Sequence, residues 1–168
     1  MASSYSSDLK LEIITTGEKA GLWGTVTNSN LEILQQAASG YLVVDMAGAD
    51  VTLALTDGAV SNGKNLYFKL TGTLAANRTL TMPAGSERIF IIEDATNRNT
   101  TKTLSIKTAS GTALAVPIGA VMLVKSDGTN TTKAITEKGY FTITSSAITA
   151  YTAVAGDQLL IDTTQTTV

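Results

Sequence analysis

The first periodic pattern along the chain is a strict alternation of apolar and polar residues. Leu9, Leu11 and Ile13 fall on one side of it, whereas Lys10, Glu12 and Ile14 fall on the other. A period of two is that of a β-strand, whose successive side chains point to opposite faces. We therefore expect a strand at residues 9–14, paired either within its own sheet or with the sheet edge of another chain.

The pattern then changes to a helical period. Ser29 and Glu32 have the spacing of a capping box, and Gly40 is placed to end a helix in the left-handed conformation. The residues between them form an apolar stripe at helical spacing: Leu31, Ile33, Leu34, Ala37 and Ala38. A helix of about ten residues is marginal alone in water. The predicted helix 29–39 must therefore pack on its own domain or on a neighbouring chain.

Short apolar stretches separated by turn sequences follow over residues 41–133. The turns include Asp57-Gly58 and Ser61-Asn62-Gly63. This spacing predicts an antiparallel, jelly-roll-like β-sandwich. The run Ile89–Ile92 is apolar throughout, which is typical of a strand covered on both faces. The expected core consists of Leu53, Leu55, Leu66, Phe68, Leu70, Leu80, Ile89, Ile91, Leu104, Ile106, Leu114, Val116, Val121 and Leu123.

The last residues begin a further β segment. Gly139-Tyr140 and the apolar residues after it echo Gly40-Tyr41. A lone hairpin is marginally stable at best, so we expect these strands to be completed by further chain or by symmetry-related copies. The predicted organisation is mainly β in three parts: residues 1–40 with a strand and a short helix, the module 41–133, and the β-hairpin start 134–168.

The composition narrows the possible functions. The formal net charge is −2 and no basic run occurs, which argues against a nucleic-acid surface. No stretch is long and apolar enough for membrane insertion, and no secretory signal is visible. The chain has neither His nor Cys, which excludes a Ser-His-Asp triad and most transition-metal sites. We predict no enzyme, no cofactor and no metal.

Three carboxylates near one another in the sequence are the nearest thing to a catalytic set. A glycosidase would need two of Glu87, Glu93 and Asp94 about 5–9.5 Å apart in one cleft. Nothing in the sequence brings them together, so we interpret them as strand-end charges. Asp157 and Asp162 lack the spacing of a calcium loop and are interpreted as turn residues.

The stretch before the predicted helix carries a resemblance to a known family. Gly21, Trp23, Gly24, Asn28, Asn30 and Leu31 form the pattern G-x-W-G-x-x-x-N-x-N-L. It resembles the N-terminal segment of tailed-phage tail-fibre and other virion structural proteins. The similarity continues over 51–58, 71–83 and 126–130. Leu22 departs from the family, in which a small polar residue is commoner.

The resemblance implies a structural component of the virion, a trimeric tail or neck fibre whose N-terminal part docks on the particle and whose distal part faces the host. Expected partners are further copies of the chain and proteins of the tail, baseplate or neck. The residues expected to dock or assemble are Leu9, Leu11, Ile13, Trp23, Asn28, Leu31 and Leu34. Trp23 is interpreted as the anchor of a packed interface or core, with ligand stacking as the alternative.

Two other functions stay open. One is a capsid decoration or head-fibre protein, which is equally structural. The other is a carbohydrate-binding module whose partner would be a host-surface glycan. Such a module needs exposed aromatic side chains, for which the candidates are Tyr67, Tyr140 and Tyr151.

Overall fold

The computed structural model of the chain describes residues 3–135, 140–142 and 158–160. The chain divides into two compact units, Met1–Ala134 and Ile135–Val168. In the second unit, strands β12 (Tyr140–Thr142) and β13 (Gln158–Leu160) pair in parallel. The predicted turn residues Asp157 and Asp162, and Tyr151, lie outside the described residues.

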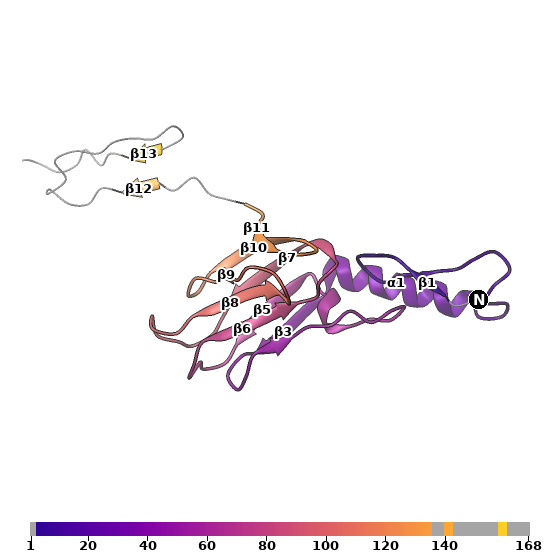
Figure 1. The fold of residues 1–168 in the computed structure, drawn as a ribbon, viewed down its shortest axis with the longest axis horizontal. Helices are drawn as coiled ribbons and strands as arrows, with labels where there is room; N and C mark the ends of the chain where they lie inside the picture. Colours follow the sequence, from indigo (N-terminus) through magenta and orange to yellow (C-terminus); the bar gives the residue numbers. More distant parts are fainter. Residues whose placement is uncertain (1–2, 136–139, 143–157, 161–168) are drawn as a thin grey trace, which may run out of the picture. The chain divides into compact units, whose positions relative to one another are not determined.

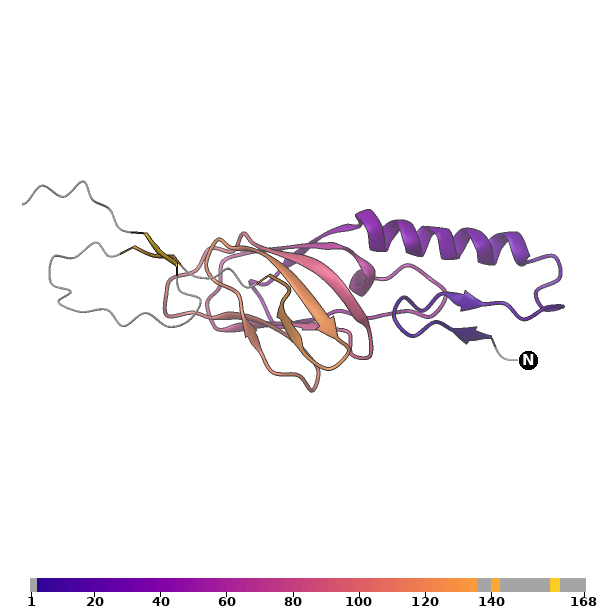
Figure 2. The same cartoon turned by 90° about the horizontal axis from the view of Figure 1, so that it is seen from above.

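The first unit begins with two short strands and a helix. Strand β1 (Ser4–Tyr5) pairs antiparallel with β2 (Glu12–Ile13), and helix α1 spans Trp23–Ser39. In Figure 2, α1 runs alongside the two strands. The predicted strand at 9–14 is therefore too long, because only Glu12 and Ile13 pair with another strand.

The start of the helix differs from the predicted one at Ser29. Helix α1 begins at Trp23 after Leu22, which provides no side-chain cap. The reason is tertiary packing: the extra N-terminal turns bury Val26, and buried apolar contact outweighs capping and intrinsic propensity in short helices. Gly40 ends the helix in an extended rather than a left-handed conformation.

Residues 41–134 form two facing sheets, whose strands are seen in Figure 1. The five-stranded sheet has the order β11-β10-β7-β5-β3, comprising Thr131–Lys133, Val121–Asp127, Glu87–Asp94, Tyr67–Thr71 and Tyr41–Asp45. The four-stranded sheet has the order β4-β6-β8-β9, comprising Val51–Thr52, Arg78–Met82, Leu104–Thr108 and Leu114–Ala115. A 3-10 turn, η1, spans Asn62–Lys64.

The chain alternates between these sheets, and successive strands of one sheet are parallel. Tyr41 lies beside Tyr67, which lies beside Ile91, and in the other sheet Val51, Leu80 and Ile106 align in the same way. The chain thus winds through three coils before the antiparallel strands β9, β10 and β11 complete the sheets. The module is mainly β with mixed pairing, so the predicted purely antiparallel sandwich is wrong.

The core lies between the two sheets. Of the predicted members, the buried ones are Leu53, Phe68, Leu70, Leu80, Leu104, Ile106 and Val116. In β7 and β10 the predicted face is wrong, because Phe90, Ile92, Met122 and Val124 point inward. Ile89 and Val121 are exposed, and the other predicted members are partly buried: Leu55, Leu66, Ile91, Leu114 and Leu123.

Buried charged side chains hold the connections between coils. Arg98 and Asp94 form an ion pair at 2.7 Å, and Arg98 also donates to the Val116 carbonyl. Arg88 donates to the carbonyls of Gly63, Lys64 and Asn65, and burial lowers its pKa to about 10. Each cation therefore fixes a loop that leaves one sheet for the other.

Candidate docking surface of the N-terminal segment

Helix α1 leaves one apolar face uncovered. Trp23 is 64% exposed, Leu31 57% and Leu34 44%, and Ala38 one turn later is also exposed. Their spacing places them on one side of the helix, within about 80° of each other. We call Trp23, Leu31, Leu34 and Ala38 the helix stripe. Three aliphatic side chains and a Trp are thus presented to solvent together.

The other apolar side of α1 is covered by the chain itself. Val26 and Ile33 are buried, and Asn30 reaches across to strand β2. The Asn30 side chain accepts from the Glu12 N–H and donates to the Glu12 carbonyl, both at 2.9 Å. The side-chain amide of Asn30 thus makes the same two hydrogen bonds to Glu12 that the backbone of a neighbouring strand would make. These bonds attach helix α1 to strand β2.

The structure brings some of the predicted site residues together and separates others from them. It brings Trp23, Leu31 and Leu34 together on the helix stripe. Asn28 is exposed on a different side of α1, and the residue that organises the segment is Asn30. The repeated Asn of the N-x-N-L pattern is the signal that points to it, although the sequence does not tell which Asn binds backbone.

The three predicted residues of the N-terminal strand do not form one buried face. Leu9 and Leu11 are partly buried, and Ile13 is 52% exposed. Between β2 and α1, Gly17 and Gly21 adopt positive φ values of 88° and 78°. These conformations favour glycine, which explains why glycine occupies both positions.

An ion pair closes this connection. The Lys19 ammonium lies 2.6 Å from the Glu12 carboxylate. The hydrogen bond from Lys19 lowers the pKa of Glu12, and Ser3 contributes in the same direction. Both side chains are partly exposed, and we assign this pair an orienting role rather than a large share of stability.

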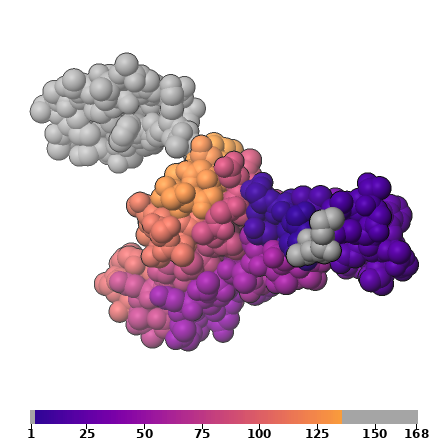
Figure 3. All heavy atoms as spheres, turned by 45° about the vertical axis from the view of Figure 1, so that its right-hand side comes forward, coloured from indigo at the N-terminus to yellow at the C-terminus, as the bar shows by residue number. Residues whose placement is uncertain are grey.

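The N-terminal segment is attached to the β module by Asp8. The Asp8 carboxylate accepts from the Glu87 N–H at 2.8 Å, and its carbonyl accepts from the Ser86 hydroxyl at 2.9 Å. Lys10 adds a bond from the Gly58 N–H to its carbonyl. In Figure 3 the spheres of this segment and of α1 form a lobe next to the sheets. The segment and the module therefore act as one body.

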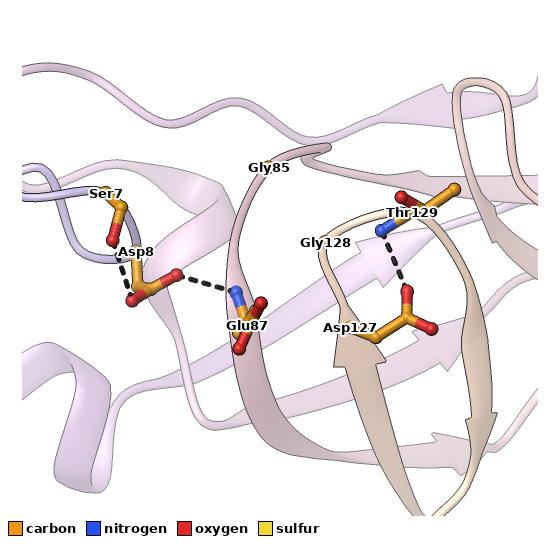
Figure 4. A pocket seen from close by; sticks show the side chains of 7 residues that line it. All are labelled: Ser7, Asp8, Gly85, Glu87, Asp127, Gly128 and Thr129. Atoms are coloured by element: carbon orange, nitrogen blue, oxygen red, sulfur yellow. Dashed lines mark hydrogen bonds between the residues drawn. The ribbon is translucent and has the colours of Figure 1, made fainter.

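Figure 4 shows a shallow pocket at this junction, lined by Ser7, Asp8, Gly85, Glu87, Asp127, Gly128 and Thr129. Two of its carboxylates, those of Asp8 and Asp127, accept hydrogen bonds from backbone N–H groups. Asp127 accepts from the N–H groups of Asn130 and Thr129, which lower its pKa. In the described part of the chain no group of three or more acidic side chains is placed to hold a metal ion. The pocket is a structural joint.

The carboxylates considered for glycoside hydrolysis are dispersed. Glu93 points to the outer face of β7, where it pairs with Lys69 at 2.9 Å. Asp94, the next residue, is buried on the opposite face with Arg98. Adjacent residues of a strand face opposite sides, so this pair does not share a cleft.

The aromatic candidates for glycan binding are only partly described. Tyr67 stacks on Tyr41 with ring centroids 5.1 Å apart, and its hydroxyl donates to Glu93. This contact covers one face of the Tyr67 ring. The side chain of Tyr140 is outside the described set, as is Tyr151.

Within the described residues, no helix has the length and apolar character needed to cross a membrane. Comparison of the chain with protein-family models, with curated proteins and with solved structures found no match.

Proposed function

We propose that this chain is a non-enzymatic structural subunit of a phage virion, a tail or neck fibre that docks through its N-terminal segment. The observation that carries the proposal is the helix stripe on α1. A helix that already uses one apolar side for its own fold has no local need for a second. Exposed Trp, Leu and Ala in one line indicate a surface that another polypeptide covers.

The first occupant of this stripe is the same helix in other copies. Leu31, Leu34 and Ala38 follow the spacing of three and four residues that forms a coiled-coil seam. Packing three such helices around an axis removes all three side chains from water. We therefore propose a homotrimer, in agreement with the resemblance of the N-terminal pattern to trimeric fibres.

Trp23 extends the stripe at the beginning of the helix, where the chain emerges from the Gly21 turn. Because it is exposed in a single chain, it adds no core to the monomer. Burying an indole against the particle would contribute roughly 2–3 kcal/mol per copy. Repetition in three copies strengthens attachment further through avidity.

Sedimentation of the full chain tests the trimer. The variant L31D/L34D places two carboxylates on the stripe and should lower the oligomer by a factor of three. The matched control N28D/Q35D adds the same charge at exposed positions beside the stripe and should keep the wild-type mass. Equal behaviour of the two variants would refute assembly through the stripe.

Attachment to the particle is tested by Trp23→Ala. We expect particles that lack this protein, while the purified variant keeps the wild-type urea midpoint because Trp23 is outside the core. Particles that retain the protein would show that Trp23 is not the anchor. Imaging its place on the wild-type particle separates a tail or neck fibre from a head decoration protein.

A further inference from the structure

The outer face of the five-stranded sheet carries several exposed apolar side chains. Its central strands contribute two rows across the sheet, set by the strand registers. The first row is Tyr41, Tyr67, Ile91 and Leu123, and the second is Val43, Lys69, Glu93 and Val121. We call these two rows the outer sheet face; Figure 1 shows its strands in the order β10, β7, β5 and β3.

Several apolar side chains of this face are exposed to solvent. Val121 is 63% exposed, and Tyr41, Val43 and the neighbouring Ile89 are also more than half exposed. The apolar area presented is on the order of 400–500 Å², within the range of the largest patch on monomeric proteins, which is often a functional surface. The apolar run Ile89–Ile92 is that of a strand covered on both faces, and the chain's core covers only one.

The polar groups of this face are already paired. Lys69 binds Glu93 at 2.9 Å, and Glu93 also accepts from the Tyr67 hydroxyl at 2.8 Å. The centre of the face therefore carries one positive and one negative charge. A strongly charged partner would gain little from such a surface, whereas a partner with the same alternation of charge would match it.

The two rows are self-complementary about one axis. Strands β10, β7, β5 and β3 are symmetric about the line between β7 and β5. A twofold axis along this line lays β5 over β7 of a second copy, and β3 over β10. Tyr67 then meets Ile91 of the copy, Tyr41 meets Leu123, and Val43 meets Val121. The same operation places Lys69 over Glu93, so aromatic meets aliphatic and each charge meets its opposite.

We propose that the outer sheet face binds a second copy of this chain by twofold packing of one five-stranded sheet on another. Sheets packed in this way lie about 10 Å apart with strands aligned to within about 30°. Together with its polar rim, each face would bury about 600 Å², or about 1,200 Å² for the pair, the lower limit of stable specific interfaces. A dissociation constant in the micromolar range is therefore expected.

This contact uses a different surface from the helix stripe, and it deepens the proposed self-assembly without depending on the trimer. A threefold contact through α1 combined with a twofold contact through the sheet gives six chains when the assembly closes. The full-chain variant L31D/L34D removes the helix contact and isolates the sheet contact. We expect that variant to sediment as a reversible dimer, twice the 17.5 kDa chain mass.

Paired charges at positions 43 and 121 test the twofold register. These side chains are exposed and lie three strands apart within one chain, about 14 Å, so that they do not pair internally. In the L31D/L34D background, V43K/V121K places Lys against Lys of the copy twice. Because like charges in contact cost several kcal/mol, dimer affinity should fall about 100-fold or more. V43K/V121E places Lys against Glu and should restore the dimer.

The control T52K/A115K adds the same charge to exposed positions on the outer side of the four-stranded sheet and should leave the dimer intact. Loss of the dimer in V43K/V121K with recovery in V43K/V121E supports the proposal. If the L31D/L34D variant remains monomeric from 1 to 100 μM, the proposed sheet contact is overturned. Equal dissociation of both charge pairs overturns the register. The trimer is judged separately, from the wild type and N28D/Q35D.

Discussion

The two sheets of the β module share one design on the inside and differ on the outside. Both alternate large apolar side chains toward the common core, for example Phe68 and Phe90 in one sheet and Leu80 and Ile106 in the other. The outer side of the four-stranded sheet carries small polar residues and one Lys: Thr52, Thr79, Thr81, Ser105 and Lys107. The outer side of the five-stranded sheet carries the two rows described above, whose charged members are Lys69 and Glu93.

The apolar character of the inner faces is explained by folding, because burial of these side chains between the sheets is the main driving force for folding of the module. A Thr-rich outer face is equally expected for a strand that meets water. The apolar outer face of the other sheet fits neither role. The difference marks the outer sheet face as the surface that we propose for contact. The predictions that follow from it compare residues that are neighbours in the sequence but face opposite sides of a sheet.

The largest expected effect comes from the inner side of β7. Phe90→Ala should lower the free energy of unfolding by roughly 3–5 kcal/mol, because it leaves a cavity opposite Phe68, whose ring it meets edge-on at 5.9 Å. Ile89→Ala, one residue away on the outer side, should change it by less than about 0.5 kcal/mol at submicromolar concentration. Urea denaturation of both variants measures the difference, and comparable losses would show that the outer side is also packed in the monomer.

The second contrast is between Glu93 and Asp94 at the end of the same strand. Burial raises the pKa of Asp94, but hydrogen bonds from Thr96 and Gly119 and the Arg98 pair outweigh it and hold the pKa below its ordinary value. Asp94→Asn should cost about 3 kcal/mol, since it leaves the buried Arg98 without its counter-charge. Glu93→Gln should change stability little because its ion pair is at the surface.

The pH dependence follows from the same shift. A carboxylate with a lowered folded-state pKa stabilises the protein above its unfolded value of about 3.9, and this contribution is lost as the pH falls through the lower folded pKa. Wild type should thus lose stability below about pH 4, whereas Asp94→Asn should lose less over that interval. Unfolding free energies from pH 2 to 7 measure this, and parallel curves would contradict it.

The sequence predicts the positions of these elements better than their partners. The apolar stretches and turns give a β module over 41–133 and a helix before it, because both depend on local periodicity. The parallel pairing of β3 with β5 cannot be predicted from the sequence. A turn that leads the chain to the opposite sheet and a turn that forms a hairpin are built from the same residue types. In the run Ile89–Ile92 every residue is apolar, so alternation does not reveal which side faces the core.

The N-terminal segment shows the same limit. The stripe residues Leu31 and Leu34 follow from helical spacing alone. The start of α1 does not, because it depends on the burial of Val26, which helical spacing alone does not predict. Likewise, Asn28 and Asn30 are equivalent in the pattern, and only the geometry gives Asn30 the backbone of Glu12 as its partner.

A smaller effect is expected from making the two outer faces alike. The variant T79V/T81I/S105V replaces the polar centre of the four-stranded sheet, including the Thr79–Ser105 contact at 3.1 Å, by β-branched apolar residues. Stability should change by less than about 1 kcal/mol, since such residues suit strands. We expect new association at 100 μM that the polar control T79S/T81S/S105T lacks. A fully monodisperse triple variant would show that apolar character alone does not make a contact face.

The smallest effect is a change in the pKa of Glu93. Its hydrogen bond from Lys69, followed by that from Tyr67, lowers this pKa, so Lys69→Met should raise it toward the ordinary value more than Tyr67→Phe does. Twofold packing adds Lys69 of the second copy opposite Glu93, and the pKa should therefore fall further as the protein concentration rises through the dimer range. By linkage, the dimer should weaken as the pH falls through that pKa. Carboxyl NMR titrations of the two single variants measure the first effect, and sedimentation of L31D/L34D from 1 to 100 μM between pH 7 and pH 3 measures the second. A dimer whose dissociation constant stays the same as the pH falls through the pKa of Glu93 would mean that the copies meet elsewhere than over the Lys69–Glu93 pair.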